Sequence, residues 1–319
     1  MLINEFRRQR TTDADVAGRV CVVTGASSGV GLNTARVLAS RGGHVVMVCR
    51  DPGRAEQARE IIAQGCTGPV DVVLADLSLM SEVRKLAEVL LTRYPSIHVL
   101  VNNAGIHSST RSFTAEGLET CFAVNHLAPF LLTLRLRERM VQSAPARILN
   151  VSSQGHRFGG LDLNDLDWEH RRYRGLKAYG ASKTANLYFT WELAAQLRGT
   201  GVTVNAVHPG SVKTRIGHNN GPLWRAIHGA LSMTLRDVRL SGEALYYLCA
   251  APELDAVSGR FFNLTYQEKP HSHAIHATHR GLARHTWLLS EQLTGLTRAL
   301  LPSCPEADRE AHPPAAPAN

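Results

Sequence analysis

The sequence predicts an α/β fold: a single Rossmann-type, doubly wound parallel sheet of about seven strands with helices on both faces. Three observations support this class. Short apolar runs typical of buried strands alternate with helix-like segments along most of the chain. A glycine-rich turn follows the first strand, and polar side chains follow several later ones. The length of 319 residues, with 44% hydrophobic and 19% charged, suits one large domain with a sizeable core.

The first strand and its turn form a phosphate-binding pattern. An apolar strand at Arg19–Val23 runs into Thr24–Gly31 and then into a helix-like segment through Leu38. In such a turn the glycines let the backbone approach a pyrophosphate, whose charge meets the positive end of the helix. The spacing is GxxxGxG. The candidate cofactor-binding residues here are Gly25, Ser27, Ser28, Gly29, Val30 and Gly31.

The end of the second strand, His44–Cys49, bears on the choice of coenzyme. In a dinucleotide fold this position meets the adenosine ribose, where an acid would bond the 2′-hydroxyl and an arginine would suit a 2′-phosphate. Cys49 can bond neither, and Arg50 follows it. We therefore infer NADP(H) rather than NAD(H), and we expect Asp51 to cap the next helix.

The ends of two further strands add polar groups to the same cleft, because the carboxyl ends of parallel strands share one edge. A strand at Val70–Ala75 and another at His98–Val101 supply the candidates Asp76, Leu77, Asn103, Ala104 and Gly105. For Asn102 we expect a side chain that ties neighbouring strands together, which is compatible with a place at the cleft.

The candidate catalytic groups come from the segments that follow. A helix predicted from Thr114 to about Arg139 carries Asn125, and a strand at Arg147–Val151 ends in Ser152 and Ser153. Tyr179 and Lys183 open an apolar-periodic helix and lie on one face, four residues apart. An ammonium beside a phenol favours the phenolate, so the tyrosine pKa should move down from about 10 toward working pH.

These motifs resemble the short-chain dehydrogenase/reductase family. The chain carries TGASSGVG, DL, NNAG, NVSS, YGASK and HPGSVKT in that order over about residues 18 to 265. More narrowly, FAVNHLAPFLLT, SKTANLYF followed by WELAAQL, and SGRFF are similar to the retinol dehydrogenase and protochlorophyllide reductase branch.

The resemblance implies a role for each candidate residue. Tyr179 would be the general acid/base, and Lys183 would lower its pKa and bind the nicotinamide ribose. Ser153, rather than Ser152, would hold the substrate oxygen, and Asn125 would carry a proton-relay water against Lys183. The resemblance also implies that Pro209, Gly210, Val212 and Thr214 bind the cofactor, and Thr214 matches the position that meets the nicotinamide carboxamide. It also implies a homodimer or homotetramer, with a seam formed by the helices predicted at 114–139 and 179–197.

The expected activity is NADP(H)-dependent interconversion of a carbonyl and an alcohol. Leu223, Trp224 and other apolar residues recur at helical spacing in the segment after Thr214, which favours a lid over a bulky hydrophobic or aromatic substrate. Two alternatives stay open: a non-catalytic NADP(H)-sensing protein, and an epimerase or dehydratase with resident NAD.

The chain is expected to have four parts. They are a flexible N-terminal tail (1–17), a catalytic domain (18–265) with a lid at about 215–238, a helical extension (266–301) and a disordered tail (302–319). As an alternative for the N-terminal tail, its Arg7, Arg8 and Arg10 could contact an acidic membrane surface.

Composition argues against several partners. The six cysteines show neither CxxC pairs nor zinc-finger spacing, which indicates reduced thiols in a cytoplasmic protein. The net charge of +8 is spread along the chain without a nucleic-acid motif, so we expect no nucleic-acid partner. There is no run of about 18 apolar residues, so we expect no stable membrane insertion. His271, His273, His276 and His279 could suggest a metal, but they lack an acidic or cysteine partner, and we expect none.

Overall fold

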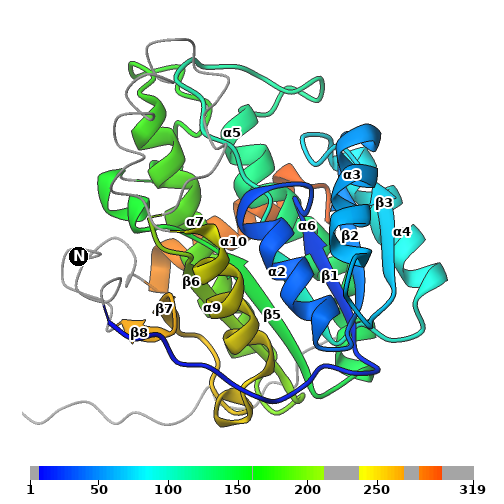
Figure 1. Cartoon of the computed structure of the whole chain (residues 1–319). Coiled ribbons are helices and arrows are strands. Elements are labelled where there is room, and N and C mark those ends of the chain that lie inside the picture. The colour runs from blue at the N-terminus through cyan, green and yellow to red at the C-terminus, as the bar shows by residue number, and fades with distance from the viewer. Residues whose placement is uncertain (1–6, 160, 212–236, 269–279, 297–319) are drawn as a thin grey trace, which may run out of the picture.

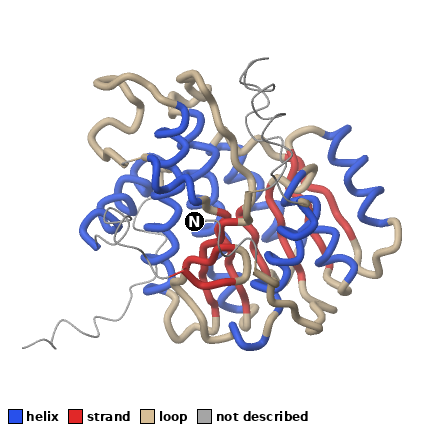
Figure 2. The backbone as a smooth tube through the Cα atoms, turned by 60° about the vertical axis from the view of Figure 1, so that its left-hand side comes forward, coloured by secondary structure: helices blue, strands red, loops and turns tan. Residues whose placement is uncertain are grey.

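A single eight-stranded sheet forms the centre of the molecule (Figures 1 and 2). The computed structural model describes residues 7–159, 161–211, 237–268 and 280–296. The strands run in the order β3-β2-β1-β4-β5-β6-β7-β8, all parallel except the last pair. They are β1 (Val20–Thr24), β2 (His44–Cys49), β3 (Val70–Leu74), β4 (Val99–Asn102), β5 (Ala146–Val151), β6 (Val202–His208), β7 (Phe261–Asn263) and β8 (Tyr266–Glu268).

This arrangement confirms the predicted fold class. The sheet has one strand more than the predicted number of about seven, because the chain turns back after β7 and adds β8 antiparallel at the edge.

Helices cover both faces of the sheet, as doubly wound topology requires (Figures 1 and 2). On one face lie α2 (Gly29–Ser40), α3 (Pro52–Ala63) and α9 (Val238–Ala250), which share one buried cluster. On the other lie α4 (Met80–Arg93), α5 (Thr120–Phe122), the π-helical turn η1 (Ala123–Leu127), α6 (Ala128–Gln142) and α7 (Gly175–Gln196), with α10 (Arg280–Leu293) against α7. Two short 3-10 turns, η2 (Gln154–Phe158) and η3 (Pro252–Leu254), complete the described elements.

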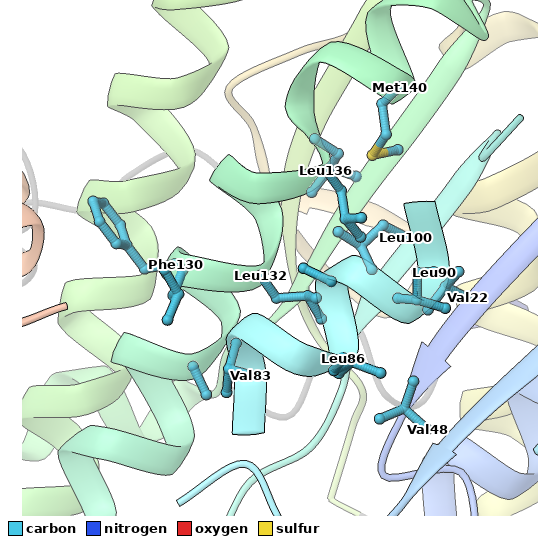
Figure 3. Packing of buried hydrophobic residues seen from close by; sticks show 14 of the residues in the cluster. Val22, Val48, Val83, Leu86, Leu90, Leu100, Phe130, Leu132, Leu136 and Met140 are labelled. Carbon is cyan, nitrogen blue, oxygen red and sulfur yellow. The ribbon is translucent and has the colours of Figure 1, made fainter. Parts of the chain in front are cut away.

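The larger core cluster packs α4 and α6 against the sheet (Figure 3). In α4 the buried side chains of Val83, Leu86 and Leu90 recur at helical spacing and face strand residues such as Leu100. Each fully buried side chain of this size contributes about 1.5–3 kcal/mol of hydrophobic stabilisation. The central strands β1 and β5 are buried at every position because both of their faces are covered.

The helix predicted from Thr114 begins six residues later, at Thr120. Before it, the backbone N–H of Thr114 donates to Leu118 O at 2.8 Å, that of Gly117 donates to Thr114 O at 3.0 Å, and Gly117 has a φ of +79°. These features close a tight turn. The Glu119 carboxylate then caps the helix by accepting from the backbone N–H groups of Cys121 and Phe122.

The N-terminal segment differs from the expected flexible tail from Arg7 onward. Val16 is fully buried, and the Tyr246 hydroxyl donates to the carbonyl of Ala14. The Arg7 guanidinium lies 4.2 Å from the centre of the Tyr266 ring. The segment therefore runs along the edge of the domain and contacts α9 and β8 (Figure 1).

Helix α10 lies in the segment expected to be a helical extension (266–301), and one side of it is buried. Trp287 is 2% exposed and packs against Phe130 of α6 and Phe189 of α7, with ring centroids 5.0 and 6.0 Å away. The chain's own helix thus covers part of the surface on which the resemblance implied a dimer seam. Among the helices described, none is long and apolar enough to cross a membrane.

Candidate active site

A cleft of about 1220 Å³ opens where the parallel strands end. Such an edge is the usual ligand site of open α/β sheets. The predicted residues that line the cleft are Gly25, Ser27, Ser28, Gly29, Val30, Arg50, Asp76, Leu77, Asn103, Ala104, Gly105, Ser153, Tyr179, Lys183, Pro209 and Gly210. Val212, Thr214, most of the lid and the four C-terminal histidines lie outside the described residues.

The glycine loop between β1 and α2 can be built only with small residues. A Cβ on Gly31 would lie 2.4 Å from the Asn103 side chain, and one on Gly25 would lie 2.9 Å from the backbone of Ala104. Gly25 also has a φ of +67°. Ser28 is the N-cap residue of α2, and its side chain makes no capping hydrogen bond. The free N–H groups of this helix start and the nearby hydroxyls suit a pyrophosphate.

Asn103 supports the loop rather than only facing the cleft. Its side-chain amide donates to Thr24 O at 2.8 Å, and the Thr24 hydroxyl accepts from the backbone N–H groups of Asn103 and Ala104 at 3.0 Å. Asn102 bonds Thr133 and Asn150, as expected for a side chain that ties β4 to its neighbour. The ends of β1 and β4 are therefore held together beneath the cofactor loop.

Two arginines lie at the cleft end next to β2. Arg50 follows the strand and Arg54 lies one helical turn later in α3, and both line the cleft. Asp51 caps α3 by accepting from Arg54 N at 2.9 Å, which confirms its predicted role. Cys49 is buried, and burial raises its pKa to about 11, so this thiol stays neutral. The cationic pair fits a phosphate on the adenosine ribose.

Tyr179 lies in the second turn of α7 and faces the cleft beside Ser153. Burial raises the pKa of Tyr179 to about 12, although its hydrogen bond with Ser153 acts in the opposite direction. This direction differs from the expectation that Lys183 would move the pKa of this phenol below 10. The reason is that the free-energy cost of burying a charged phenolate exceeds the stabilisation that neighbouring groups give it.

Lys183 is held at the base of the cleft. Its ammonium donates to Val151 O at 2.9 Å and lies 5.5 Å from the centre of the Tyr179 ring. The side chain is 3% exposed, and this burial lowers its pKa to about 8. The Ser152 hydroxyl donates to Lys183 O at 3.0 Å, so it is already engaged in the core and does not replace Ser153 as the candidate beside Tyr179.

Asn125 sits in the π-helical turn behind the cleft. Its side-chain oxygen accepts from Ile106 N at 2.7 Å, and its amide donates to Ile106 O at 2.9 Å and to the Ser182 hydroxyl at 3.0 Å. A Cβ on Gly105 would lie 3.3 Å from the Asn125 oxygen and 3.4 Å from the Lys183 ammonium. Asn125 therefore fixes the loop after β4 close to Lys183.

Several cleft residues were missed by sequence reasoning. The imidazole of His107 lies edge-on to the Tyr179 ring, with centroids 5.8 Å apart, and Ile106, Val124 and Leu176 add apolar surface nearby. Arg54 could have been found from its position in the first turn of the helix that Asp51 was expected to cap, close in the chain to Arg50. For His107 the sequence holds no comparable signal.

Comparison with known proteins agrees with this geometry. A family model described as short chain dehydrogenase matches residues 19–222. Retinol dehydrogenase 13 of Homo sapiens is 37% identical over 294 residues, covering 89% of this chain and 86% of its own. Retinol dehydrogenase 12 of Mus musculus is 42% identical over 257 residues, covering 79% and 80%.

Solved structures share the fold as well. A putative uncharacterized protein from Mycobacterium paratuberculosis superposes with a TM-score of 0.71 and 32% identity, covering 90% of this chain and 98% of that one. A putative NAD(P) dependent gluconate 5-dehydrogenase from Beutenbergia cavernae with bound NADP has a TM-score of 0.63 and 29% identity, covering 78% and 96%. With this cleft and these similarities, the chain belongs to the short-chain dehydrogenase family, in its retinol dehydrogenase-like branch, and is an oxidoreductase.

Proposed function

We propose that this protein is an NADP(H)-dependent oxidoreductase that interconverts a carbonyl and an alcohol on a bulky hydrophobic substrate. The observation that carries the proposal is the meeting of Tyr179, Ser153 and Lys183 in one cleft with a glycine-rich phosphate loop. Metal ligands are not needed for this chemistry.

The residues of the cleft fit a dinucleotide. Gly25 and Gly31 leave space that a side chain would fill, and the start of α2 offers free N–H groups. Arg50 and Arg54 would hold the 2′-phosphate that distinguishes NADP(H). When bound, the nicotinamide supplies hydride for reduction or accepts it for oxidation.

The protein's own residues would then handle the proton. In reduction Tyr179 gives its proton to the carbonyl oxygen while that carbon gains hydride, and Ser153 donates a hydrogen bond to the same oxygen. Lys183, when protonated, stabilises the phenolate that forms. In oxidation the steps reverse, and the tyrosinate takes the hydroxyl proton.

The substrate class rests on two observations. Ile106, Val124 and Leu176 give the cleft near Tyr179 an apolar lining, and the similar mammalian proteins are named retinol dehydrogenases. We propose retinaldehyde or another long or aromatic aldehyde or ketone. The described cysteines are all free, in keeping with the cytoplasm as the proposed location.

Removing one oxygen atom tests the proposal. Tyr179→Phe should bind NADPH normally but reduce all-trans-retinal and 4-nitrobenzaldehyde about 10²- to 10⁴-fold more slowly, because general acid help is lost. Tyr188→Phe is the matched control, since Tyr188 lies on the same helix, is buried, and its hydroxyl has no hydrogen-bond partner among the described residues. Loss of NADPH absorbance gives the rate. Normal turnover by Tyr179→Phe would refute the assignment.

A further inference from the structure

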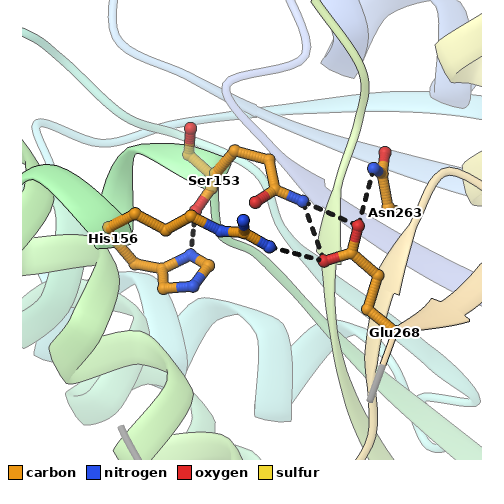
Figure 4. Close-up of polar contacts among 6 residues, drawn as sticks. Ser153, His156, Asn263 and Glu268 are labelled. Carbon is orange, nitrogen blue, oxygen red and sulfur yellow. Dashed lines mark hydrogen bonds and ion pairs between the residues drawn. The ribbon is translucent and has the colours of Figure 1, made fainter. Parts of the chain in front are cut away.

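A buried carboxylate lies behind the turn that carries Ser153 (Figure 4). Glu268 is the last residue of β8, and its side chain is 9% exposed. Both of its oxygens accept from Gln154 Nε2, at 3.0 and 2.9 Å. It also accepts from Arg157 Nη2 at 3.3 Å and from Asn263 Nδ2 at 2.9 Å. One carboxylate thus joins the turn η2 to the two edge strands.

The turn that Glu268 holds sets the position of the Ser153 hydroxyl. Ser153 Oγ accepts from Gly155 N at 3.0 Å. Figure 4 shows the second contact, in which Ser153 O accepts from His156 Nδ1 at 2.6 Å. Gln154, whose side-chain amide donates to both oxygens of Glu268, is the next residue after Ser153. A five-residue 3-10 turn has little stability of its own, so contacts outside it must fix its path.

The two sides of this contact depend on each other. Strand β8 is only three residues long and, among the described strands, lies at the edge of the sheet and pairs only with β7. A carboxylate this far from water is costly unless its donors stay in place. Movement of either β8 or the turn η2 would separate Glu268 from its hydrogen-bond donors. The strand and the turn are therefore held in one arrangement relative to each other.

We propose that Glu268 is a positioning residue that holds Ser153 against Tyr179. The inference rests on the proposed function, in which Ser153 bonds the substrate oxygen and the catalytic phenol. Glu268 itself acts only through Gln154 and the turn. Because misplacing a reacting group by about 1 Å can cost 10²-fold in rate, loss of this contact should be visible in turnover.

A double-mutant cycle separates positioning from general stability. Glu268→Gln keeps the shape of the side chain but places an NH₂ group where a carboxylate oxygen accepts hydrogen bonds, so part of the contact with Gln154 is lost. We expect reduction of all-trans-retinal to slow about 10- to 100-fold. NADPH affinity should not change. In a Ser153→Ala background the same change should have almost no further effect, since the hydroxyl that it positions is gone. Glu253→Gln is the control, because it removes an equal charge from a carboxylate that bonds Tyr247 instead.

The outcomes decide the inference in both directions. An equal slowing by Glu268→Gln with and without the Ser153 hydroxyl, or no slowing at all, would overturn it. If Glu268→Gln does not fold, Gln154→Met serves in the same cycle, because it breaks the link to Ser153 and leaves Glu268 bonded to Arg157 and Asn263.

A second measurement does not require turnover. With 3-fluorotyrosine incorporated at position 179, the fluorine resonance reports the contact with Ser153. Glu268→Gln should shift it as Ser153→Ala does, with no further shift in the double variant. If the two changes shift the fluorine resonance non-additively but the protein reduces no carbonyl compound, only the proposed function is contradicted. Additive shifts in the double variant would contradict the role of Glu268.

Discussion

Replacing Arg50 with glutamine should weaken NADPH binding much more than NADH binding. Arg50 lies at the cleft end where the adenosine ribose is expected, directly after β2, and it is exposed. A hydrogen bond to a charged group contributes about 1.5–3 kcal/mol, and solvent screening favours the lower value at an exposed site. Since about 1.4 kcal/mol corresponds to a tenfold change, we expect the Kd for NADPH to rise about tenfold.

The assay is a fluorescence titration of both coenzymes with the native protein and the variant. Arg59→Gln is the matched control, because Arg59 lies on the same helix as Arg54, carries the same charge and pairs with Glu56 outside the cleft. The control separates a local phosphate contact from attraction by the net charge of +8. Equal weakening of NADPH and NADH, or an equal effect of Arg59→Gln, would show that Arg50 does not bind a 2′-phosphate.

Three further outcomes follow from the same structure. With its pKa lowered to about 8, Lys183 is protonated at neutral pH, so kcat for carbonyl reduction should be level below about pH 8 and fall above it; a stopped-flow pH profile with no change there would contradict this role. Trp287→Ala should lower the free energy of unfolding by about 3–5 kcal/mol, measured in urea, because it leaves a cavity beside Phe130 and Phe189. Because α10 covers part of the expected seam, light scattering should give a monomer near 34.8 kDa, and a dimer would require another surface.

The parts of the fold that sequence predicts well are those specified by neighbours in the chain. The strand Val20–Thr24 is apolar at almost every position, and the glycine loop after it needs small residues for local reasons. The edge strand Tyr266–Glu268 escaped prediction because three residues with one buried carboxylate carry no strand periodicity. Its place depends on pairing with β7 and on side chains more than a hundred residues earlier.

The same distinction applies to the site. Strand ends placed most candidate residues at the cleft, since topology alone brings those ends together. The start of the helix before Asn125 was misplaced, because the apolar spacing after Thr114 suited a helix while Gly117 and the cap at Glu119 decided otherwise. Ionisation was misjudged as well, because burial is a property of the folded chain.

The raised pKa of Tyr179 bears on how this tyrosine could act as the proposed general acid. Burial raises the pKa of Tyr179 to about 12 and lowers that of Lys183 to about 8, so both side chains are driven toward their neutral forms. A lysine one turn away is then insufficient to make the phenol acidic. Among the described residues around Tyr179, Ser153 is the one whose hydrogen bond lowers the pKa of the phenol and so favours the phenolate. In the mechanism that we propose, catalysis should therefore depend on where the serine hydroxyl is held, and so on the turn that follows it as well as on the lysine.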